Sequence, residues 1–235
     1  MKTGFVLIHG AGLGGWIWRD VETQLKQPAL AVDFPGRALT PGQRGVLSLN
    51  DYVADVQAQI EAFECERVIL VAHSIGGVLA LPIAAALGDR VAGMVAIGAA
   101  IPNDGGSFAS CLPLPKRLLM KALIRVMGTR PPESVIGAGL GSDLSAELSA
   151  ELVERFAPES AALYFEDCQA AVPEVPRWYV RLTADKEFGD ALQAKMIANL
   201  GTQKVVDVAS GHLPMLSQAE ALSAHLNAFA REIEG

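Results

Sequence analysis

The sequence predicts an α/β fold in which a mostly parallel sheet carries helices on both faces. Short apolar runs alternate along the chain with stretches whose apolar residues recur at helical spacing, as parallel strands alternate with their crossover helices. Hydrophobic residues make up 51% of the 235 residues, which is enough to fill the core of such a fold. A chain of this length commonly forms one α/β unit, so we expect a single domain over residues 1–235.

Six strands are expected, each from a short apolar run. The runs lie at residues 4–8, 29–34, 67–72, 93–98, 177–182 and 204–208. Between the second and third runs, a helix is indicated by the spacing of Val53, Val56, Ile60 and Phe63. The last helix is indicated in the same way by Leu222, Leu226, Phe229 and Ile233. Ser217 and Glu220 stand three residues apart before it, a spacing that predicts a capping box at its start.

Residues 101–175 interrupt this alternation. The segment contains the proline-rich stretches "LPLPKR" and "TRPPES" and two helical stretches, at 117–127 and 146–156, but no obvious strand. Helices inserted between two strands of an α/β sheet most simply form a cap over the carboxyl ends of the strands, where ligands bind. We therefore expect a helical cap insertion at about residues 101–175.

Charge and chain composition exclude several classes of partner. The net charge is −7 and the 19 lysine and arginine residues are scattered along the chain, so no nucleic acid partner is expected. No apolar run approaches the roughly 18 uninterrupted residues of a membrane helix, so no membrane partner is expected either. The first apolar run follows Met1 almost directly, without the features of a signal peptide, and we expect a cytoplasmic location.

The cysteines and histidines do not suggest a metal site. Cys65, Cys111 and Cys168 lie far apart, are odd in number and do not form a C-x-x-C pair, so neither a disulfide framework nor a zinc site is predicted. The four histidines are scattered as well. We expect no metal and no cofactor.

The glycine-rich stretch "HGAGLGG" after the first expected strand allows two interpretations. Gly10, Gly12 and Gly15 spell G-x-G-x-x-G, and Asp33 closes the next apolar run, as in the dinucleotide-binding fingerprint. The same loop could instead offer backbone N–H groups to an oxyanion in a hydrolase. The first interpretation predicts an NAD(P)-dependent oxidoreductase, and the second predicts an ester-cleaving enzyme.

The stretch "VILVAHSIGG", residues 68–77, favours the hydrolase. A nucleophilic serine on a sharp turn between a strand and a helix needs small residues two positions before and after it. Ala72 and Gly76 meet this need around Ser74, so the pattern G-x-S-x-G is present with alanine for the first glycine. The alternative is an ordinary serine that caps the following helix.

A serine nucleophile needs a histidine base that is itself oriented by a carboxylate. In hydrolases with the chain order nucleophile, acid and base, the base follows the last strand. His212 lies in a loop there, whereas His225 lies inside the last helix, so His212 is the candidate base. Asp185 follows the fifth expected strand closely and is the candidate acid. Asp104, beyond the fourth strand, is its rival.

An oxyanion that forms when a serine attacks an ester needs two preorganised N–H donors. Ile75, which follows the candidate nucleophile, and Ala11, in the glycine-rich loop, are the candidates. His9 and His73, which precede the loop and the serine, are expected to be buried supports. The hydrolase interpretation accounts for the loop, the serine, the acid and the base together, whereas the dinucleotide interpretation leaves the last three unexplained.

On these residues the sequence resembles the α/β-hydrolase superfamily, and within it the plant methylesterase and hydroxynitrile lyase group. The similar segments are "FVLIHGAGLGGWIW", "VILVAHSIGGVLAL", "LTADKEFGDALQAKMIANLG" and "ASGHLPMLSQAEAL". The resemblance implies the α/β-hydrolase fold and a set of roles: nucleophile Ser74, acid Asp185, base His212, and oxyanion donors Ala11 and Ile75.

Two positions favour the esterase branch of this group. Its lyases carry threonine after the first-loop histidine and lysine after the catalytic histidine, and this sequence has Gly10 and Leu213 there. We therefore expect a cofactor-free serine hydrolase that cleaves a small, largely apolar carboxylic ester through an acyl-enzyme. Three alternatives stay open: a lyase on the same scaffold, a ligand-binding receptor with negligible turnover, and the NAD(P)-dependent oxidoreductase.

Overall fold

The computed structural model describes residues 2–36, 43, 45–103, 105–202 and 204–234. Within them lies a sheet of six parallel strands in the order β2-β1-β3-β4-β5-β6. The strands are β1 (Thr3–Ile8), β2 (Ala29–Ala31), β3 (Arg67–His73), β4 (Val91–Ile97), β5 (Arg177–Leu182) and β6 (Val205–Val208). Each overlaps one of the six apolar runs, so the predicted parallel α/β fold is confirmed.

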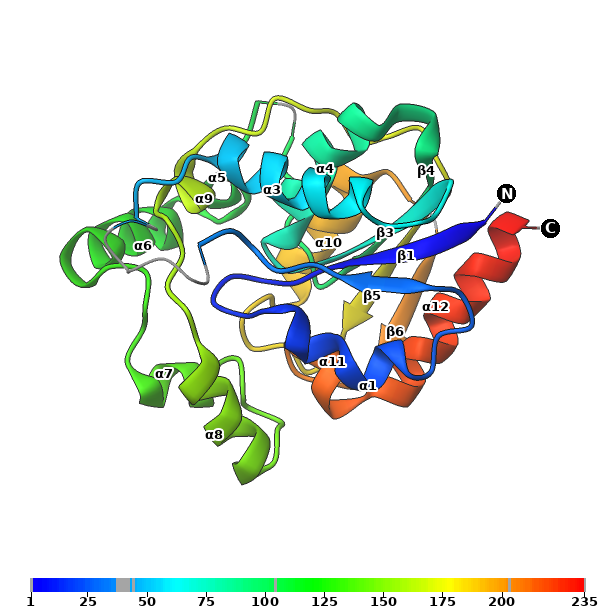
Figure 1. Ribbon diagram of the computed structural model, residues 1–235. Helices are drawn as coiled ribbons and strands as arrows, with labels where there is room; N and C mark the ends of the chain where they lie inside the picture. Colours follow the sequence, from blue (N-terminus) through cyan, green and yellow to red (C-terminus); the bar gives the residue numbers. More distant parts are fainter. Residues whose placement is uncertain (1, 37–42, 44, 104, 203, 235) are drawn as a thin grey trace.

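Helices cover both faces of the sheet (Figure 1). One face packs against α3 (Leu49–Glu61), α4 (Gly76–Leu87) and α10 (Asp190–Leu200), and the other against α1 (Arg19–Glu22), α11 (Pro214–Ser217) and α12 (Ala219–Glu234). Two short 3-10 helices complete this part, η1 (Gly15–Trp18) and η2 (Gly88–Arg90). Successive side chains of a strand point to opposite faces, so β1 buries Val6 and Ile8 on one side and Phe5 and Leu7 on the other. Burial on both faces explains why β1, β3 and β4 are continuous apolar runs.

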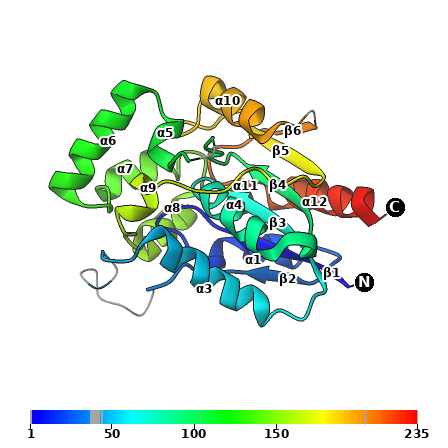
Figure 2. The ribbon, with the colours of Figure 1, turned by 90° about the horizontal axis from the view of Figure 1, so that it is seen from above.

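Between β4 and β5 the described residues form helices. These are α5 (Phe108–Cys111), α6 (Leu114–Met127), α7 (Glu133–Ala138), α8 (Ala146–Arg155) and α9 (Ala162–Phe165). In both ribbon views α6, α7 and α8 lie at the end of the molecule opposite the two chain termini (Figures 1 and 2). We refer to residues 101–175 as the helical insertion.

The predicted capping box of the last helix is wrong. Pro214, which is well suited to the first position of a helix, starts the short helix α11. Ser217 ends α11, and its hydroxyl donates to the carbonyl oxygen of Leu213 at 3.3 Å, so α12 begins separately at Ala219. A capping box is found instead at α3, where Ser48 and Asp51 each accept a hydrogen bond from the other's backbone N–H.

The register of the sheet sets two loops side by side. Ile8 at the end of β1 pairs with Ala72 near the end of β3. The glycine-rich loop and the turn that carries Ser74 therefore leave the sheet next to each other. Because the strands are parallel, the loops after β5 and β6 emerge at the same edge.

Candidate active site

Four loops at the carboxyl edge of the sheet carry the residues that the sequence singled out. Ala11 follows β1, Ser74 follows β3, Asp185 follows β5 and His212 follows β6. The structure brings the last three into direct contact, although Ser74 and His212 are 138 residues apart in the chain. Asp104, the rival acid, lies outside the described residues.

A continuous chain of hydrogen bonds joins the three side chains. The Nδ1–H of His212 donates to Oδ2 of Asp185 at 2.7 Å, and the Oγ of Ser74 lies 3.0 Å from Nε2 of His212. The other carboxylate oxygen of Asp185 accepts from the N–H groups of Glu187 at 2.8 Å and Phe188 at 3.0 Å. The His212 and Asp185 side chains are 2% and 0% exposed. This arrangement can move the serine proton to Nε2 while the carboxylate stabilises the imidazolium.

Ser74 occupies a strained turn between β3 and α4. Its φ is 55°, and no other non-glycine residue in the described part of the chain has a positive φ. A Cβ at Gly76 would lie 2.8 Å from the carbonyl oxygen of His9, so the close approach of the two loops requires glycine there. Helix α4 takes Ile75 as its N-cap without a side-chain hydrogen bond, so Ser74 does not act as a helix cap. The turn has the geometry of a nucleophile elbow.

Two backbone N–H groups beside Ser74 have no partner among the residues that the structure describes. Neither the N–H of Ala11 nor that of Ile75 donates a hydrogen bond to another described group. Unpaired backbone donors are rare in folded proteins, above all at a residue as buried as Ile75, which is 1% exposed. Ala11 lines the same cavity as Ser74 and His212, and Ile75 follows Ser74 directly. Two free donors at this place fit the requirement of an oxyanion.

His9 and His73 are buried supports, as the sequence predicted. His9 donates through Nδ1 to the carbonyl oxygen of Gly10 at 2.7 Å and accepts from the N–H of Phe34 at 3.2 Å, which braces the glycine-rich loop. His73 donates through Nε2 to the carbonyl oxygen of His212 at 2.8 Å. Burial, and then the neighbouring His212, keep the pKa of His73 well below its ordinary value of 6.5. His73 is therefore a neutral donor at neutral pH.

A buried carboxylate of the helical insertion holds the glycine-rich loop. Glu159, 4% exposed, accepts from the N–H of Gly12 at 3.2 Å and from the Tyr52 hydroxyl at 3.1 Å. The N–H of Ala157 donates to the carbonyl oxygen of Gly12 at 2.9 Å. Gly12 has a φ of 77°, and a Cβ there would lie 2.2 Å from the ring of Phe156. Sequence reasoning missed Glu159, because a single carboxylate 147 residues from its partner forms no motif.

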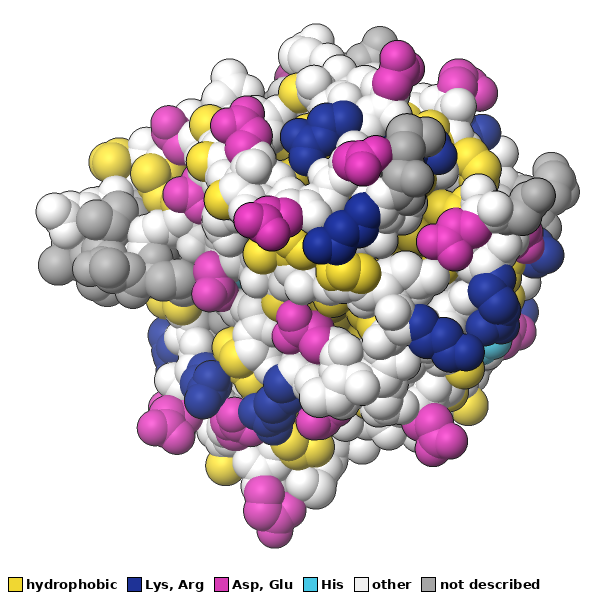
Figure 3. Space-filling view, turned by 45° about the vertical axis from the view of Figure 1, so that its right-hand side comes forward, with side chains coloured by type: hydrophobic (Ala, Val, Ile, Leu, Met, Phe, Trp, Pro, Cys, Tyr) yellow, Lys and Arg dark blue, Asp and Glu magenta, His cyan; other side chains and the backbone are white. Residues whose placement is uncertain are grey.

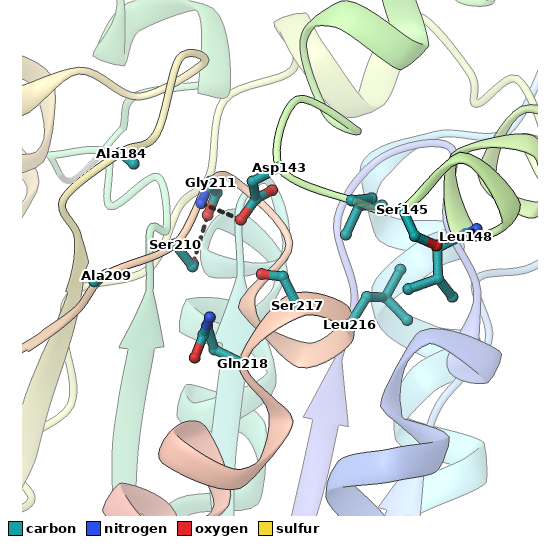
Figure 4. A pocket seen from close by; sticks show the side chains of 11 residues that line it. Asp143, Ser145, Leu148, Ala184, Ala209, Ser210, Gly211, Leu216, Ser217 and Gln218 are labelled. Carbon is teal, nitrogen blue, oxygen red and sulfur yellow. Dashed lines mark hydrogen bonds between the residues drawn. The ribbon is translucent and has the colours of Figure 1, made fainter.

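Asp143 holds the loop of His212 in a similar way. Its Oδ2 accepts from the N–H of Gly211 at 2.6 Å, while the Ser210 hydroxyl donates to the carbonyl oxygen of Gly211 at 2.8 Å (Figure 4). The backbone N–H and the carbonyl oxygen of Gly211, the residue before His212, thus both form hydrogen bonds. These residues line a hollow of about 340 Å³ whose lining includes neither Ser74 nor His212. Sequence reasoning missed Asp143 too, for the same reason as Glu159.

Ser74 and His212 open onto a cavity of about 170 Å³. Much of its wall is apolar, with contributions from Leu13, Ile136, Leu140 and Phe156. A larger hollow of about 690 Å³ lies beside α6. The two share Phe108, Thr129, Pro131, Val135, Tyr164 and Glu187 in their walls, so the hollow continues into the cavity. An apolar group of a bound molecule could extend from Ser74 toward α6.

The contacts of the glycine-rich loop do not support the dinucleotide interpretation. The Asp33 carboxylate, which would have to face a ribose, accepts from the N–H of Gly15 at 2.8 Å. Gly15 begins the four-residue 3-10 helix η1 rather than a long helix whose N-terminus could hold a pyrophosphate. Gly12 is covered by the helical insertion, as described above. The loop is thus bound by protein groups where a cofactor would lie.

Comparisons with known proteins support this fold. A family model described as "Alpha/beta hydrolase family" matches residues 5–225. A carbendazim hydrolyzing esterase of Nocardioides sp. is 37% identical over 46% of this chain and 47% of its own length. Methylesterase 18 of Arabidopsis thaliana is 37% identical over 31% of this chain and 30% of its own length. The chain therefore spans less than half the length of these two relatives.

A solved structure is similar over nearly the whole chain. It is an extracellular α/β-hydrolase from a Paenibacillus species, with a TM-score of 0.84 and 19% identity over 95% of this chain and 97% of that one. At this identity the likeness concerns the fold. The six-stranded sheet and its helices thus have the same fold as that protein.

Proposed function

Since the chain belongs to the alpha/beta hydrolase family, we propose that it is a serine esterase whose catalytic residues are Ser74, His212 and Asp185. The observation that carries this proposal is the unbroken chain of hydrogen bonds from Asp185 through His212 to the hydroxyl of Ser74, at 2.7 and 3.0 Å. The positive φ of Ser74 supports it, because strain of this kind persists where the surrounding structure enforces it, often at active sites.

The reaction proceeds through an acyl-enzyme. Ser74 Oγ attacks the ester carbonyl while Nε2 of His212 takes its proton and then returns it to the departing alcohol. The negative charge on the carbonyl oxygen is stabilised by the N–H groups of Ala11 and Ile75. Water, activated by His212, then releases the acid and restores the serine. Asp185 keeps the imidazole in the tautomer that leaves Nε2 able to accept a proton.

The substrate is a small, largely apolar carboxylic ester. A cavity of about 170 Å³ accommodates a compact group beside Ser74, and its apolar wall favours a group without charge. We propose further that the chain is one domain in which the helical insertion is the cap over this site. The contacts of Glu159 with Gly12 and of Asp143 with Gly211 support that arrangement.

A lyase on the same scaffold receives less support. Leu213, which follows His212, is fully buried and neutral, so it cannot supply the positive charge that would stabilise departing cyanide. Gly10 likewise offers no hydroxyl to a cyanohydrin. Release of cyanide from mandelonitrile that depends on Ser74 would reverse this ranking.

Labelling and turnover of one protein sample test the proposal. A fluorophosphonate probe should modify Ser74, as located by mass spectrometry, and p-nitrophenyl acetate should give burst release of p-nitrophenol. Ser74→Ala should reduce kcat about 10⁴- to 10⁶-fold with an unchanged circular dichroism spectrum. A folded variant that keeps a tenth of the activity contradicts the assignment. Tight ligand binding with labelling but no turnover would favour the receptor.

A further inference from the structure

Exposed apolar side chains gather on one helix of the insertion. Of the nine large apolar side chains that are exposed in the described part of the chain, seven lie within residues 114–135. Six of these belong to α6, namely Leu114, Leu118, Leu119, Leu123, Val126 and Met127. None of the residues of α6 is buried, and Val126 is 83% exposed. Exposure of this extent on one element marks an interaction site.

Helix α6 is also basic, in a chain whose net charge is −7. Its four charged residues are Lys116, Arg117, Lys121 and Arg125, and it has no acidic residue. None of the four pairs with a carboxylate of the described chain. Arg117, Lys121 and Arg125 are spaced by four and form one stripe. By contrast, basic and acidic side chains are mixed over the face of the molecule in Figure 3.

The apolar residues of α6 divide between two sides of the helix. Met120, Ile124 and Met127 line the hollow of about 690 Å³ that continues into the cavity of Ser74. Leu114, Leu118 and Val126 do not line it and are 65%, 59% and 83% exposed. Their spacing by multiples of four puts them along one side of the helix, next to the basic stripe. Figures 1 and 2 place this helix at the end of the molecule, where a flat surface could reach it.

We propose that α6 is an interfacial helix that docks the protein on an anionic lipid surface. The stripe of Leu114, Leu118 and Val126 enters the boundary between headgroups and acyl chains, and the basic stripe binds the lipid phosphates. Helix α6 has 14 residues, fewer than the roughly 20 that a spanning helix needs, so it lies in the plane of the surface. No helix in the described residues has the length and apolarity to cross a bilayer. The sequence-based expectation of no membrane partner considered only helices that span a membrane. It did not consider helices that lie on a membrane surface. A second copy of the chain suits α6 less well, because two basic stripes would repel each other.

Docking would bring the lipid to α6, whose other side lines the hollow. An amphiphilic ester dissolved there could pass along the inner side of α6 to Ser74 without crossing water. This consequence rests on the proposed function, whereas docking itself does not. The substrates of the docked enzyme would then be esters that partition into lipid.

Vesicle co-sedimentation of the full chain tests the docking. The protein should sediment with vesicles of phosphatidylcholine and phosphatidylglycerol, bind pure phosphatidylcholine much less, and be released by high salt. The double variants Leu118→Glu with Val126→Glu, and Lys121→Gln with Arg125→Gln, should each weaken binding roughly tenfold or more. Matched controls are Val205→Glu, at an exposed apolar residue of β6, and Lys26→Gln with Arg231→Gln, at exposed basic residues elsewhere. The controls should bind as the wild type does.

Two outcomes would overturn the docking proposal. One is no binding to the anionic vesicles, and the other is binding that the two α6 variants leave unchanged. Sedimentation velocity gives the oligomeric state, and a dimer that the α6 variants dissociate would show that a second copy covers the helix instead. All variants should hydrolyse p-nitrophenyl acetate in solution within about twofold of wild type, because none of the changed residues lines the cavity or the hollow. Ser74→Ala should bind vesicles normally, so failure of the esterase proposal is distinguishable from failure of docking.

Discussion

His212 is held by three groups that stand at the ends of two strands, β3 and β5. Asp185 accepts its Nδ1–H, the Ser74 hydroxyl lies against its Nε2, and His73 binds its carbonyl oxygen. Because the proton on Nδ1 is fixed by the carboxylate, Nε2 presents a lone pair to the serine. Asp143 adds a fourth restraint through Gly211. The imidazole is thus preorganised before a substrate arrives.

Asp185→Asn should lower kcat about 10²- to 10⁴-fold with little change in the fold. An amide can donate to Nδ1 and so select the wrong tautomer, and it cannot stabilise the imidazolium. Asp104→Asn should change kcat only a few-fold. Steady-state kinetics of the two variants, with circular dichroism as the folding control, make the comparison. The opposite order would make Asp104 the acid.

His73 should make stability depend on pH. Since its pKa is lowered in the folded state, the unfolded chain binds a proton first as the pH falls below 6.5. The stability that the neutral ring contributes is complete above 6.5 and is lost as the pH falls from there toward the folded pKa. As the pH falls below 6.5, the slope of the free energy of unfolding against pH should steepen toward about 1.4 kcal/mol per pH unit, the limit for one proton.

Urea unfolding of His73→Gln at a series of pH values checks this expectation. The variant should be less stable than wild type at neutral pH, because a buried hydrogen bond is lost, but its stability should fall less steeply below 6.5. His225→Gln, at a partly exposed histidine of α12, is the control and should keep the slope of the wild type. Equal slopes for all three proteins would mean that His73 does not stay neutral.

Sequence reasoning could single out residues that sit in motifs or directly after strands. Ser74 lies in a recognisable turn sequence, and His212 and Asp185 follow apolar runs, so their loops were expected at one edge of the sheet. Glu159 and Asp143 have no such mark. Each accepts a hydrogen bond from a backbone N–H of a distant loop. In the sequence alone, such a carboxylate cannot be distinguished from any other aspartate or glutamate.

At the scale of elements, burial decides what a sequence can predict. Strands β1, β3 and β4 are buried on both faces and appear as unbroken apolar runs, and the more exposed strands β2 and β6 also lie in short apolar runs, so all six were located. The start of a helix depends on one or two polar side chains. A nearby residue that favours another start, such as a proline, can override them. At Ser217 the spacing of a capping box was present, but Pro214 three residues earlier began another helix. At Ser48 the reciprocal bonds of a capping box do form.

Ser48 and Ser217 form a matched pair for testing this difference. Ser48→Ala removes the acceptor of the Asp51 N–H at the start of α3, so it should lower the free energy of unfolding by about 1 kcal/mol. Ser217→Ala removes only a long hydrogen bond to Leu213 and should change stability by less than about 0.5 kcal/mol. Urea titrations monitored by far-UV circular dichroism measure both. A larger effect at Ser217 would mean that it caps α12 in solution.

At the scale of the whole molecule, the helical insertion is joined to the sheet by two kinds of contact. On the outside, Arg19 of α1 binds Glu151 of α8 through two hydrogen bonds of 2.6 and 2.8 Å, with side chains that are 41% and 26% exposed. Inside, Glu159 and Asp143 accept backbone N–H groups from loops of the candidate site. Exposed ion pairs contribute little to stability, whereas a buried donor without its acceptor is costly. The inner contacts should therefore couple the insertion to catalysis.

Variants of Glu159 and Glu151, two carboxylates of the insertion, distinguish the effect of the inner contacts from that of the outer ion pair. Glu159→Ala leaves the Gly12 N–H and the Tyr52 hydroxyl without this partner and should cost about 2 kcal/mol or more in the free energy of unfolding. It should also lower kcat about tenfold, because the neighbouring Ala11 N–H is no longer held in place. KM should change little, since Glu159 does not line the cavity.

Glu159→Gln keeps an acceptor for Gly12 and should recover most of kcat, a rescue that a general loss of packing would not produce. Glu151→Gln should cost less than about 1 kcal/mol and leave kcat within about twofold of wild type. Steady-state kinetics and urea unfolding of the three variants provide the comparison. If Glu151→Gln lowered kcat as much as Glu159→Ala does, the position of the insertion as a whole would control the glycine-rich loop, and the bond from Gly12 to Glu159 would have no special part in catalysis.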